Sequence, residues 1–101
     1  MLKVNYEYKR GVLFVRLDGN LDSRNIYLLV NSIKQIIKIG GIRFIVLNVE
    51  NVYALNDSYI RYLIEDIKES EVYLCGYNSS NYNDSNILLN RESSIFNYIN
   101  L

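Results

Sequence analysis

The chain has 101 residues, half of them hydrophobic, and its eleven Lys and Arg side chains are balanced by eleven Asp and Glu side chains. This length fits a single domain with one core, spanning residues 1–101. A net charge of zero supplies no field to hold a polyanion, which argues against nucleic acid as a partner. Histidine is absent, so the commonest general base and metal ligand is missing, and we expect no catalytic residue, no metal and no cofactor.

The sequence also bears on where the protein is found. Residues 1–11 alternate apolar and polar side chains and lack the apolar core of a signal peptide, and no stretch approaches the roughly 20 apolar residues of a membrane span. The single cysteine, Cys75, lies in an apolar run and has no second cysteine with which to form a disulfide, which suits a reducing compartment. We therefore expect a cytoplasmic protein without a membrane span.

Two segments at the start of the chain predict a β-hairpin. Residues 3–9 and 12–18 are predicted to form two strands. In the first, Val4, Tyr6 and Tyr8 alternate with polar residues at the two-residue period of a half-buried strand. A tight turn at residues 9–11 joins them. We expect this hairpin at one edge of a sheet.

A first amphipathic helix is predicted after the hairpin. Residues 26–37 carry apolar side chains at the 3.6-residue period, and Asp22 or Ser23 is placed to cap the helix N-terminus. Gly40 and Gly41 follow and end the helix, because the left-handed conformations used at helix C-termini cost glycine little.

The next part of the chain predicts strands that alternate with a second helix. Residues 44–47 form a continuous apolar run typical of a central strand covered on both faces. Residues 57–69 return to helical spacing, and residues 72–76 form another short strand. This order over residues 12–76 implies right-handed crossovers and parallel pairing. The predicted fold class is α/β, with a mixed sheet made of an N-terminal antiparallel hairpin plus parallel strands.

The C-terminal part gives weaker patterns. Residues 78–86 contain almost no apolar side chains and are predicted to form an exposed loop. Residues 87–89 predict a last edge strand, and residues 94–99 place three apolar side chains at the spacing of a short closing helix.

Four segments, in their order and spacing, carry a resemblance to a known family. They are VLFVRLDGNLD at 12–22, with a Gly-x-Leu-Asp turn; GIRFIVLNVENV at 41–52, a central strand; LNDSYI at 55–60; and the helix that follows. Together they resemble the STAS family, and specifically the bacterial anti-sigma factor antagonists, over residues 4–76. The resemblance implies a single STAS-like domain whose helices cover mainly one face of the mixed sheet. It further implies a transcription regulator that binds an anti-sigma factor or a related kinase-fold regulatory protein.

The resemblance is informative where it departs from the family. In family members the segment matching residues 55–60 carries a serine that the anti-sigma kinase phosphorylates. Alignment without gaps places that serine on Asp57 and the family's preceding Asp on Asn56. The family's second hydroxyl falls on Ser58, and its Gly falls on Tyr59, whose ring would obstruct a kinase. The resemblance thus implies a domain that keeps the scaffold and loses the usual phosphoacceptor.

Two compatible interpretations of Asp57 stay open. A helix N-terminus tolerates a carboxylate, so the fixed charge makes the protein resemble a permanently phosphorylated antagonist or suits a partner adapted to a charge. Alternatively, Asp57 simply caps the helix. Ser58 is an alternative phosphoacceptor, turned by about 100° on the helix. Asn56 is most simply interpreted as a turn or cap residue.

One flank of the predicted second helix is a candidate partner surface. Tyr59, Tyr62 and Asp66 share this flank when the apolar side chains face inward. Tyrosine is favoured at interfaces because it brings contact area with little loss of entropy. The alternative is that ten tyrosines in the chain reflect a compositional bias and that some exposed rings have no function.

Two further functions stay open. One is a scaffold subunit of a larger complex, stressosome-like or transport-associated. The other is an enzyme that uses Asp18, Asp22 and Glu50, near strand ends, for a metal or for acid–base chemistry. The lack of histidine and of a glycine-rich phosphate loop argues against this enzyme, and each acid is more simply a solvated turn residue. Homo-oligomerisation is undetermined, although the edge strand of the hairpin is able to pair with a copy of itself.

Overall fold

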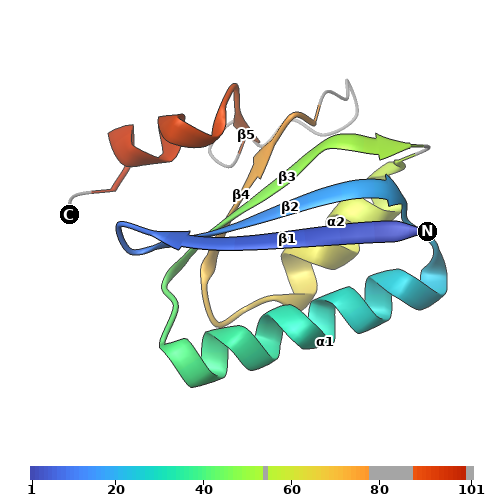
Figure 1. Cartoon of the computed structure of the whole chain (residues 1–101), viewed down its shortest axis with the longest axis horizontal. Coiled ribbons are helices and arrows are strands. Elements are labelled where there is room, and N and C mark those ends of the chain that lie inside the picture. The colour runs from blue at the N-terminus through green and yellow to red at the C-terminus, as the bar shows by residue number, and fades with distance from the viewer. Residues whose placement is uncertain (54, 78–87, 100–101) are drawn as a thin grey trace.

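The computed structural model describes residues 1–53, 55–77 and 88–99 and shows a five-stranded sheet with helices packed on it (Figure 1). The strands follow one another across the sheet in chain order; the first pair is antiparallel and the others are parallel. The strands are β1 (Leu2–Lys9), β2 (Val12–Asn20), β3 (Phe44–Tyr53), β4 (Glu71–Cys75) and β5 (Leu88–Leu89). The predicted mixed α/β sheet is confirmed, with β3 at its centre.

The N-terminal hairpin follows directly from the residues at its turn. Arg10 and Gly11 both take left-handed backbone conformations, with φ of 53° and 84°. Such a pair matches the right-handed twist of the flanking strands and allows a two-residue connection. The register runs from Leu2 opposite Gly19 to Lys9 opposite Val12. The predicted hairpin is confirmed, and β1 is an edge strand.

Helix α1 (Ser23–Gly40) begins at a capping box. The Asp22 carboxylate accepts hydrogen bonds from the backbone N–H of Arg24 at 3.0 Å and of Asn25 at 2.8 Å, while the Asn25 side chain accepts from the Asp22 N–H at 2.8 Å. This reciprocal arrangement satisfies N–H groups that have no partner within the helix. Gly41 ends α1 in the left-handed conformation, with φ of 63°. Of the two predicted caps, the structure therefore uses Asp22.

Helix α2 (Asp57–Asp66) is shorter than the predicted 57–69. Ile67 has φ of −93° and ψ of 95°, so the chain is already extended there. Its side chain is still buried, at 2 % exposure. The apolar period continued past the helix because Ile67 anchors the connection to β4 in the core, and the predicted end of the helix was wrong for that reason.

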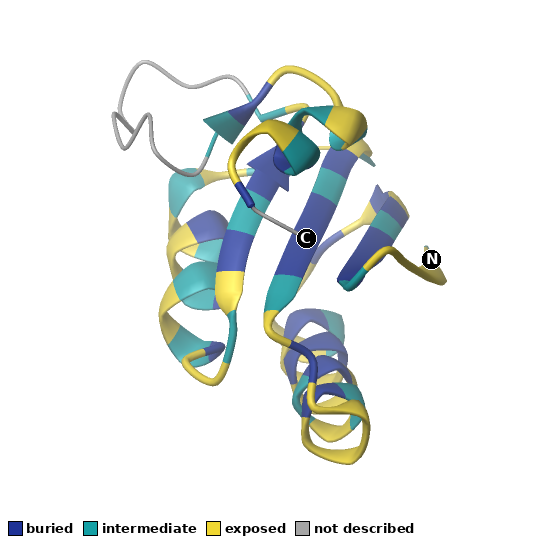
Figure 2. Ribbon diagram, turned by 90° about the vertical axis from the view of Figure 1, so that its left-hand side faces the viewer, coloured by how far each residue is buried: buried dark blue, intermediate teal, exposed yellow. Residues whose placement is uncertain are grey.

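The two helices α1 and α2 cover the same face of the sheet, where most of the core lies (Figures 1 and 2). The inward sides of the helices are buried and their outward sides are exposed. This large cluster joins side chains of β2, β3 and β4 to both helices, and it includes Val15, Leu17, Val30, Ile33, Ile45, Leu47, Ile60, Leu63 and Leu74.

A short 3₁₀ helix, η1 (Glu92–Asn97), packs on the opposite face (Figure 1). It begins two residues before the predicted closing helix. Its Ile95 is fully buried in a second, smaller apolar cluster with Val12, Phe14, Val46, Cys75, Leu89 and Ile99. Burial raises the pKa of the Cys75 thiol, which is 3 % exposed. The predicted loop at 78–86 and the first residue of the predicted strand 87–89 lie outside the described residues.

An ion-pair network holds η1 to the sheet. The Arg16 guanidinium donates to both carboxylate oxygens of Glu92 at 2.8 Å, and the Asn48 side chain donates to Glu92 at 2.9 Å. The same guanidinium contacts Glu7 at 2.8 Å and Asn5 at 3.1 Å. Hydrogen bonds from Arg16 and Asn48 hold the pKa of Glu92 below its usual value, against the opposing effect of burial. Residues 76 positions apart in the sequence are thus joined by a bidentate pair.

Candidate functional site

The predicted partner-binding residues Asn56, Asp57 and Ser58 lie at the end of the sheet where β2 and β3 finish. Figure 1 shows β2 and β3 ending, and α1 and α2 beginning, at the same end of the molecule. This arrangement is general for parallel strands joined by helical crossovers, and it gathers helix N-termini and loops at one edge.

Two glycines allow the chain to approach itself closely at this end. Gly19 has φ of 124°, and a Cβ there would overlap the carbonyl oxygen of Met1. Gly76 has φ of 83°, and a Cβ there would lie 2.7 Å from the Cβ of Glu50. A side chain at either position would therefore push neighbouring backbone apart. Gly19 is the glycine of the Gly-x-Leu-Asp turn noted in the sequence.

Asn56 supplies the cap at the N-terminus of α2. Its side-chain Oδ1 accepts a hydrogen bond from the Tyr59 N–H at 3.0 Å, and its carbonyl accepts from the Ile60 N–H at 3.3 Å. The interpretation of Asn56 as a cap is confirmed. Asp57 is the first helical residue, so the alternative that Asp57 itself caps the helix is wrong. A carboxylate in the first turn is nevertheless favourable, because the helix N-terminus carries partial positive charge.

Asp57 and Ser58 differ in how far solvent reaches them. Ser58 is exposed and Asp57 is half-buried. The exposed hydroxyl follows the carboxylate by one helical position, which turns it by about 100° around the axis. The structure therefore presents a negative charge and an accessible hydroxyl side by side at the tip of α2.

Tyr59 and Tyr62 lie in a groove between the two helices. Both rings are half-buried and pack against the large core cluster. Together with Ser23, Ile26 and Tyr27 of α1 they line an apolar groove of about 280 Å³. The flank predicted for Tyr59 and Tyr62 thus faces α1. No pattern in the sequence indicated that Tyr27, 57 % exposed, forms the opposite wall.

Asp66 lies at the far end of α2 and pairs with α1. Its Oδ2 is 3.1 Å from Nζ of Lys34. Hydrogen bonding to Asp66 raises the pKa of Lys34. The six predicted site residues therefore divide between the tip of α2, the groove beside α1, and this bridge between the helices.

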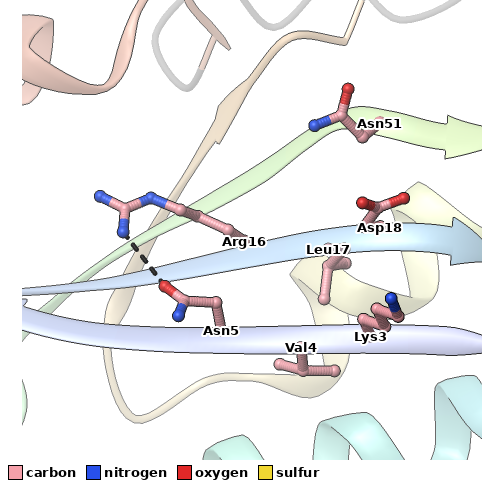
Figure 3. A pocket seen from close by; sticks show the side chains of 7 residues that line it. All are labelled: Lys3, Val4, Asn5, Arg16, Leu17, Asp18 and Asn51. Atoms are coloured by element: carbon pink, nitrogen blue, oxygen red, sulfur yellow. Dashed lines mark hydrogen bonds between the residues drawn. The ribbon is translucent and has the colours of Figure 1, made fainter.

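The carboxylates considered for catalysis do not form one centre. Asp22 caps α1, and Glu50 lies beside Gly76. Asp18 lines a hollow of about 290 Å³ near the start of β1, together with Lys3, Val4, Asn5, Arg16, Leu17 and Asn51 (Figure 3). In the described residues, no three His, Cys, Asp or Glu side chains gather closely enough to hold a metal ion. The same part of the chain contains no helix long and apolar enough to cross a membrane.

Comparison with known proteins identifies the family. The family model of the STAS domain matches residues 3–81. The chain belongs to the STAS domain family. No curated protein matches the sequence.

Several solved structures share this fold. The anti-sigma factor antagonist SpoIIAA in its unphosphorylated form has a TM-score of 0.70 at 16 % identity, over 92 % of this chain and 93 % of that one. The Bacillus cell fate determinant SpoIIAA in the phosphorylated form has a TM-score of 0.72 at 15 % identity, over 97 % and 100 %. An antisigma-factor antagonist STAS domain from Rhodobacter sphaeroides has a TM-score of 0.55 at 14 % identity, over 74 % and 86 %. Identities this low establish the common fold.

Proposed function

We propose that this STAS domain is a cytoplasmic regulatory module that acts as an anti-sigma factor antagonist, with no catalytic step of its own. Its partner is an anti-sigma factor or a related kinase-fold regulatory protein, bound through the tip of α2 and the adjoining groove. The observation that carries the proposal is the position of Asp57, a fixed carboxylate at the first residue of α2 beside the exposed Ser58.

A helix N-terminus accommodates negative charge without disturbing the domain that carries it. The orphan N–H groups and the helix dipole stabilise an anion there, whether a carboxylate or a phosphate. The effect on a bound protein is different, because that protein must desolvate the charge or meet it with charges of its own. Asp57 gives the chain one permanent negative charge where a phosphoserine would carry about 1.5 to 2.

The two structural neighbours in opposite phosphorylation states are relevant to this charge. SpoIIAA in its unphosphorylated form and SpoIIAA in the phosphorylated form resemble this chain to nearly the same degree, with TM-scores of 0.70 and 0.72. The fold is therefore compatible with a charged or an uncharged acceptor. We infer that Asp57 replaces the acceptor serine and that the partner of this chain is adapted to the fixed charge.

The groove beside the tip supplies the apolar part of the proposed surface. Tyr27, Tyr59 and Tyr62 present aromatic rings that are partly buried and partly accessible. Rings already held by packing lose little entropy when a partner covers them, which is why tyrosine is common at interfaces. Asp66 contributes indirectly, since its ion pair with Lys34 fixes α1 and α2 relative to each other.

The test is binding of the purified chain to the anti-sigma factor candidates of its own genome, with ADP present. Wild type is compared with Asp57→Ser, and Glu65→Gln is the matched control because it removes an exposed carboxylate from the same helix. We expect wild type and Glu65→Gln to bind equally and Asp57→Ser to change the dissociation constant. Binding by the Ser variant alone would identify Asp57 as a built-in off state.

Absence of binding by both wild type and Asp57→Ser would reject the anti-sigma assignment and favour a scaffold subunit of a larger complex. Ser58 is tested separately, by mass spectrometry of the chain after incubation with each candidate kinase and ATP. Phosphate on Ser58 that disappears in Ser58→Ala would restore a reversible switch one residue beyond the usual acceptor. An unmodified Ser58 would leave the fixed charge of Asp57 as the proposed signal at the tip.

A further inference from the structure

The outer edge of β1 is long and uncovered in the single chain. The strand runs for eight residues, and all of them except Leu2 are exposed. No strand of the described residues pairs with this edge, because β1 is the end of the sheet. Natural proteins shorten, bend or cover such edges, since an exposed row of backbone N–H and C=O groups invites another strand.

The side chains that β1 directs toward α1 are apolar. Val4, Tyr6 and Tyr8 are 36 %, 38 % and 60 % exposed, respectively. Across a groove of about 380 Å³ from Val4 and Tyr6 lies Leu28 of α1, which is 60 % exposed. An edge strand and a helix therefore share an open apolar stripe, of the kind that marks a protein contact surface.

The opposite face of β1 carries charges in a symmetric pattern. Lys3 and Glu7 stand two residues before and two residues after Asn5, and the strand alternation places all three on the η1 side. Figure 3 shows Asn5 on this side with its hydrogen bond from Arg16. Opposite charges placed evenly around a central residue are complementary to the same strand turned by a two-fold axis.

We propose that two copies of the chain pair antiparallel through β1, with the two-fold axis at Asn5. In this register Lys3 lies opposite the partner's Glu7, and the symmetric pair repeats the contact. On the α1 side, Val4 lies opposite the partner's Tyr6. The two sheets become one ten-stranded sheet with no open β1 edge, and the apolar stripes of both copies meet.

Charge selects this register over its neighbours. Moving the axis to Tyr6 sets Lys3 against the partner's Lys9, a like-charge pair. Moving it to Val4 shortens the paired segment and sets Lys3 opposite the partner's Asn5, so that both Lys3–Glu7 pairs are lost. A shift of one residue on one strand would set the apolar side of one copy against the polar side of the other. The register centred on Asn5 places Lys3 opposite Glu7 in two symmetric pairs and keeps a long segment of the two strands paired.

The charged side chains are accessible to a partner strand. Glu7 uses Oε1 for its 2.8 Å ion pair with Arg16, and the side chain is 46 % exposed. Lys3 is exposed and has no ion pair within the described part of the chain. The groove beside β1 is lined by Leu28, and the groove beside α2 is lined by Tyr27, on a different flank of α1. The β1 edge therefore lies away from the proposed partner surface. A dimer of this kind leaves the tip of α2 open.

The test is sedimentation equilibrium of the full chain over a range of concentrations. Wild type is expected to form a dimer, and Lys3→Glu and Glu7→Lys alone are each expected to weaken it by on the order of tenfold or more, since two attractive pairs become two repulsive ones. An equimolar mixture of the two variants should dimerise again, because position 3 of each chain then faces the opposite charge at position 7 of the other. Circular dichroism confirms that each variant is folded.

Three results would overturn the proposal. A wild-type chain that stays monomeric at all concentrations rejects it, because the edge is then unused. Dimers that persist in both single variants reject β1 as the interface. Single variants that are monomeric and stay so when mixed reject the register. None of these results depends on an anti-sigma factor, so failure here is distinguishable from failure of the proposed function.

Discussion

The two faces of the sheet are stabilised in different ways. The face under α1 and α2 is closed by one large apolar cluster that reaches from β2 to β4. The face under η1 carries a smaller apolar cluster, and its cover is a six-residue 3₁₀ helix. There the bidentate pair between Arg16 and Glu92 ties the cover to the strands, and the Arg10 guanidinium lies 4.3 Å from the centre of the Phe96 ring.

This difference indicates that stability is unevenly distributed. Removal of a side chain from the large cluster affects both helices and three strands together, so we expect the whole domain to lose stability. The cover on the other face is short and has few partners, and a 3₁₀ helix has poorer hydrogen-bond geometry than an α-helix. We expect η1 to open locally before the rest of the domain unfolds.

The largest predicted effect tests this contrast with two buried isoleucines. Ile33 of α1 and Ile95 of η1 are both 0 % exposed. Ile33→Ala should lower the free energy of unfolding by about 2–5 kcal/mol, the range for deletion of a buried aliphatic side chain. Ile95→Ala should cost less globally, because η1 is able to detach while the helix-covered core stays folded. Urea denaturation followed by circular dichroism measures both.

The matched control is Ile39→Ala, which removes an isoleucine that is 84 % exposed near the end of α1. It should change the free energy of unfolding by no more than about 0.5 kcal/mol. Equal losses for Ile33→Ala and Ile95→Ala would show that both faces unfold as one unit and would contradict the uneven distribution.

The second prediction concerns the ion pair between Arg16 and Glu92 that holds η1 to the sheet. Arg16→Met should lower stability by about 1–2 kcal/mol, because Glu92 loses two charge-assisted hydrogen bonds in a partly exposed setting. Glu92→Gln should cost less than Arg16→Met, and the double variant should cost less than the sum of the two. That coupling in a double-mutant cycle measures the pair itself. Hydrogen exchange of the Tyr98 and Ile99 amides, both bonded to the Ile95 carbonyl, reports the opening of η1.

Arg61→Met is the control, since it removes the same charge from an exposed position on α2. It should leave amide exchange in η1 unchanged. If Arg16→Met and Arg61→Met had the same effect on stability and on amide exchange in η1, the Arg16–Glu92 pair would contribute no more to stability than an exposed charge does.

The same contrast explains which parts of the fold the sequence predicts. Apolar periods along β2, α1 and β3 predicted the strands, the helix and their order, because on that face burial follows from the spacing of neighbouring residues. The ion pair between Arg16 and Glu92 joins residues 76 positions apart, and the sequence around each residue is like that around any solvent-exposed charged side chain. Only the fold brings the two together, so no local pattern reveals the pair.

The candidate site divides along similar lines. Asn56 before a helical period predicted a cap, since capping depends on residues three apart. The groove depends on which flank of α2 contacts α1. The helical period shows which side of α2 faces the core, but it does not show which flank lies next to α1. The sequence therefore indicated neither Tyr27 as the opposite wall of the groove nor the ion pair that Asp66 makes with Lys34.

The third prediction concerns a local polar contact on the helix-covered face. Asn56→Ala removes the acceptor of the Tyr59 N–H and should lower the free energy of unfolding by about 1 kcal/mol, the usual cost of losing an N-cap. Asn31→Ala, at an exposed position inside α1, is the matched control and should be neutral or slightly stabilising, because alanine is the better helix former. A loss for Asn31→Ala equal to that for Asn56→Ala would mean that the cap contact is not the cause.

The smallest predicted effect is a dependence of stability on pH in the acid range that comes from Glu92 on the η1 face. The folded pKa of Glu92 lies below its ordinary value of 4.5, chiefly because Arg16 hydrogen-bonds its charged form. Its contribution to stability is therefore complete above that ordinary value and is lost as the pH falls through the folded pKa. Urea midpoints of wild type and Glu92→Gln should differ most at neutral pH and converge in acid, because the glutamine cannot titrate. Other acids, including the neighbouring Glu7, titrate in both proteins, so the difference between the two curves isolates Glu92. A difference that stayed constant from neutral pH to strong acid would show that the negative charge of Glu92 adds nothing to its contact with Arg16, and the attachment of η1 would then not depend on this ion pair.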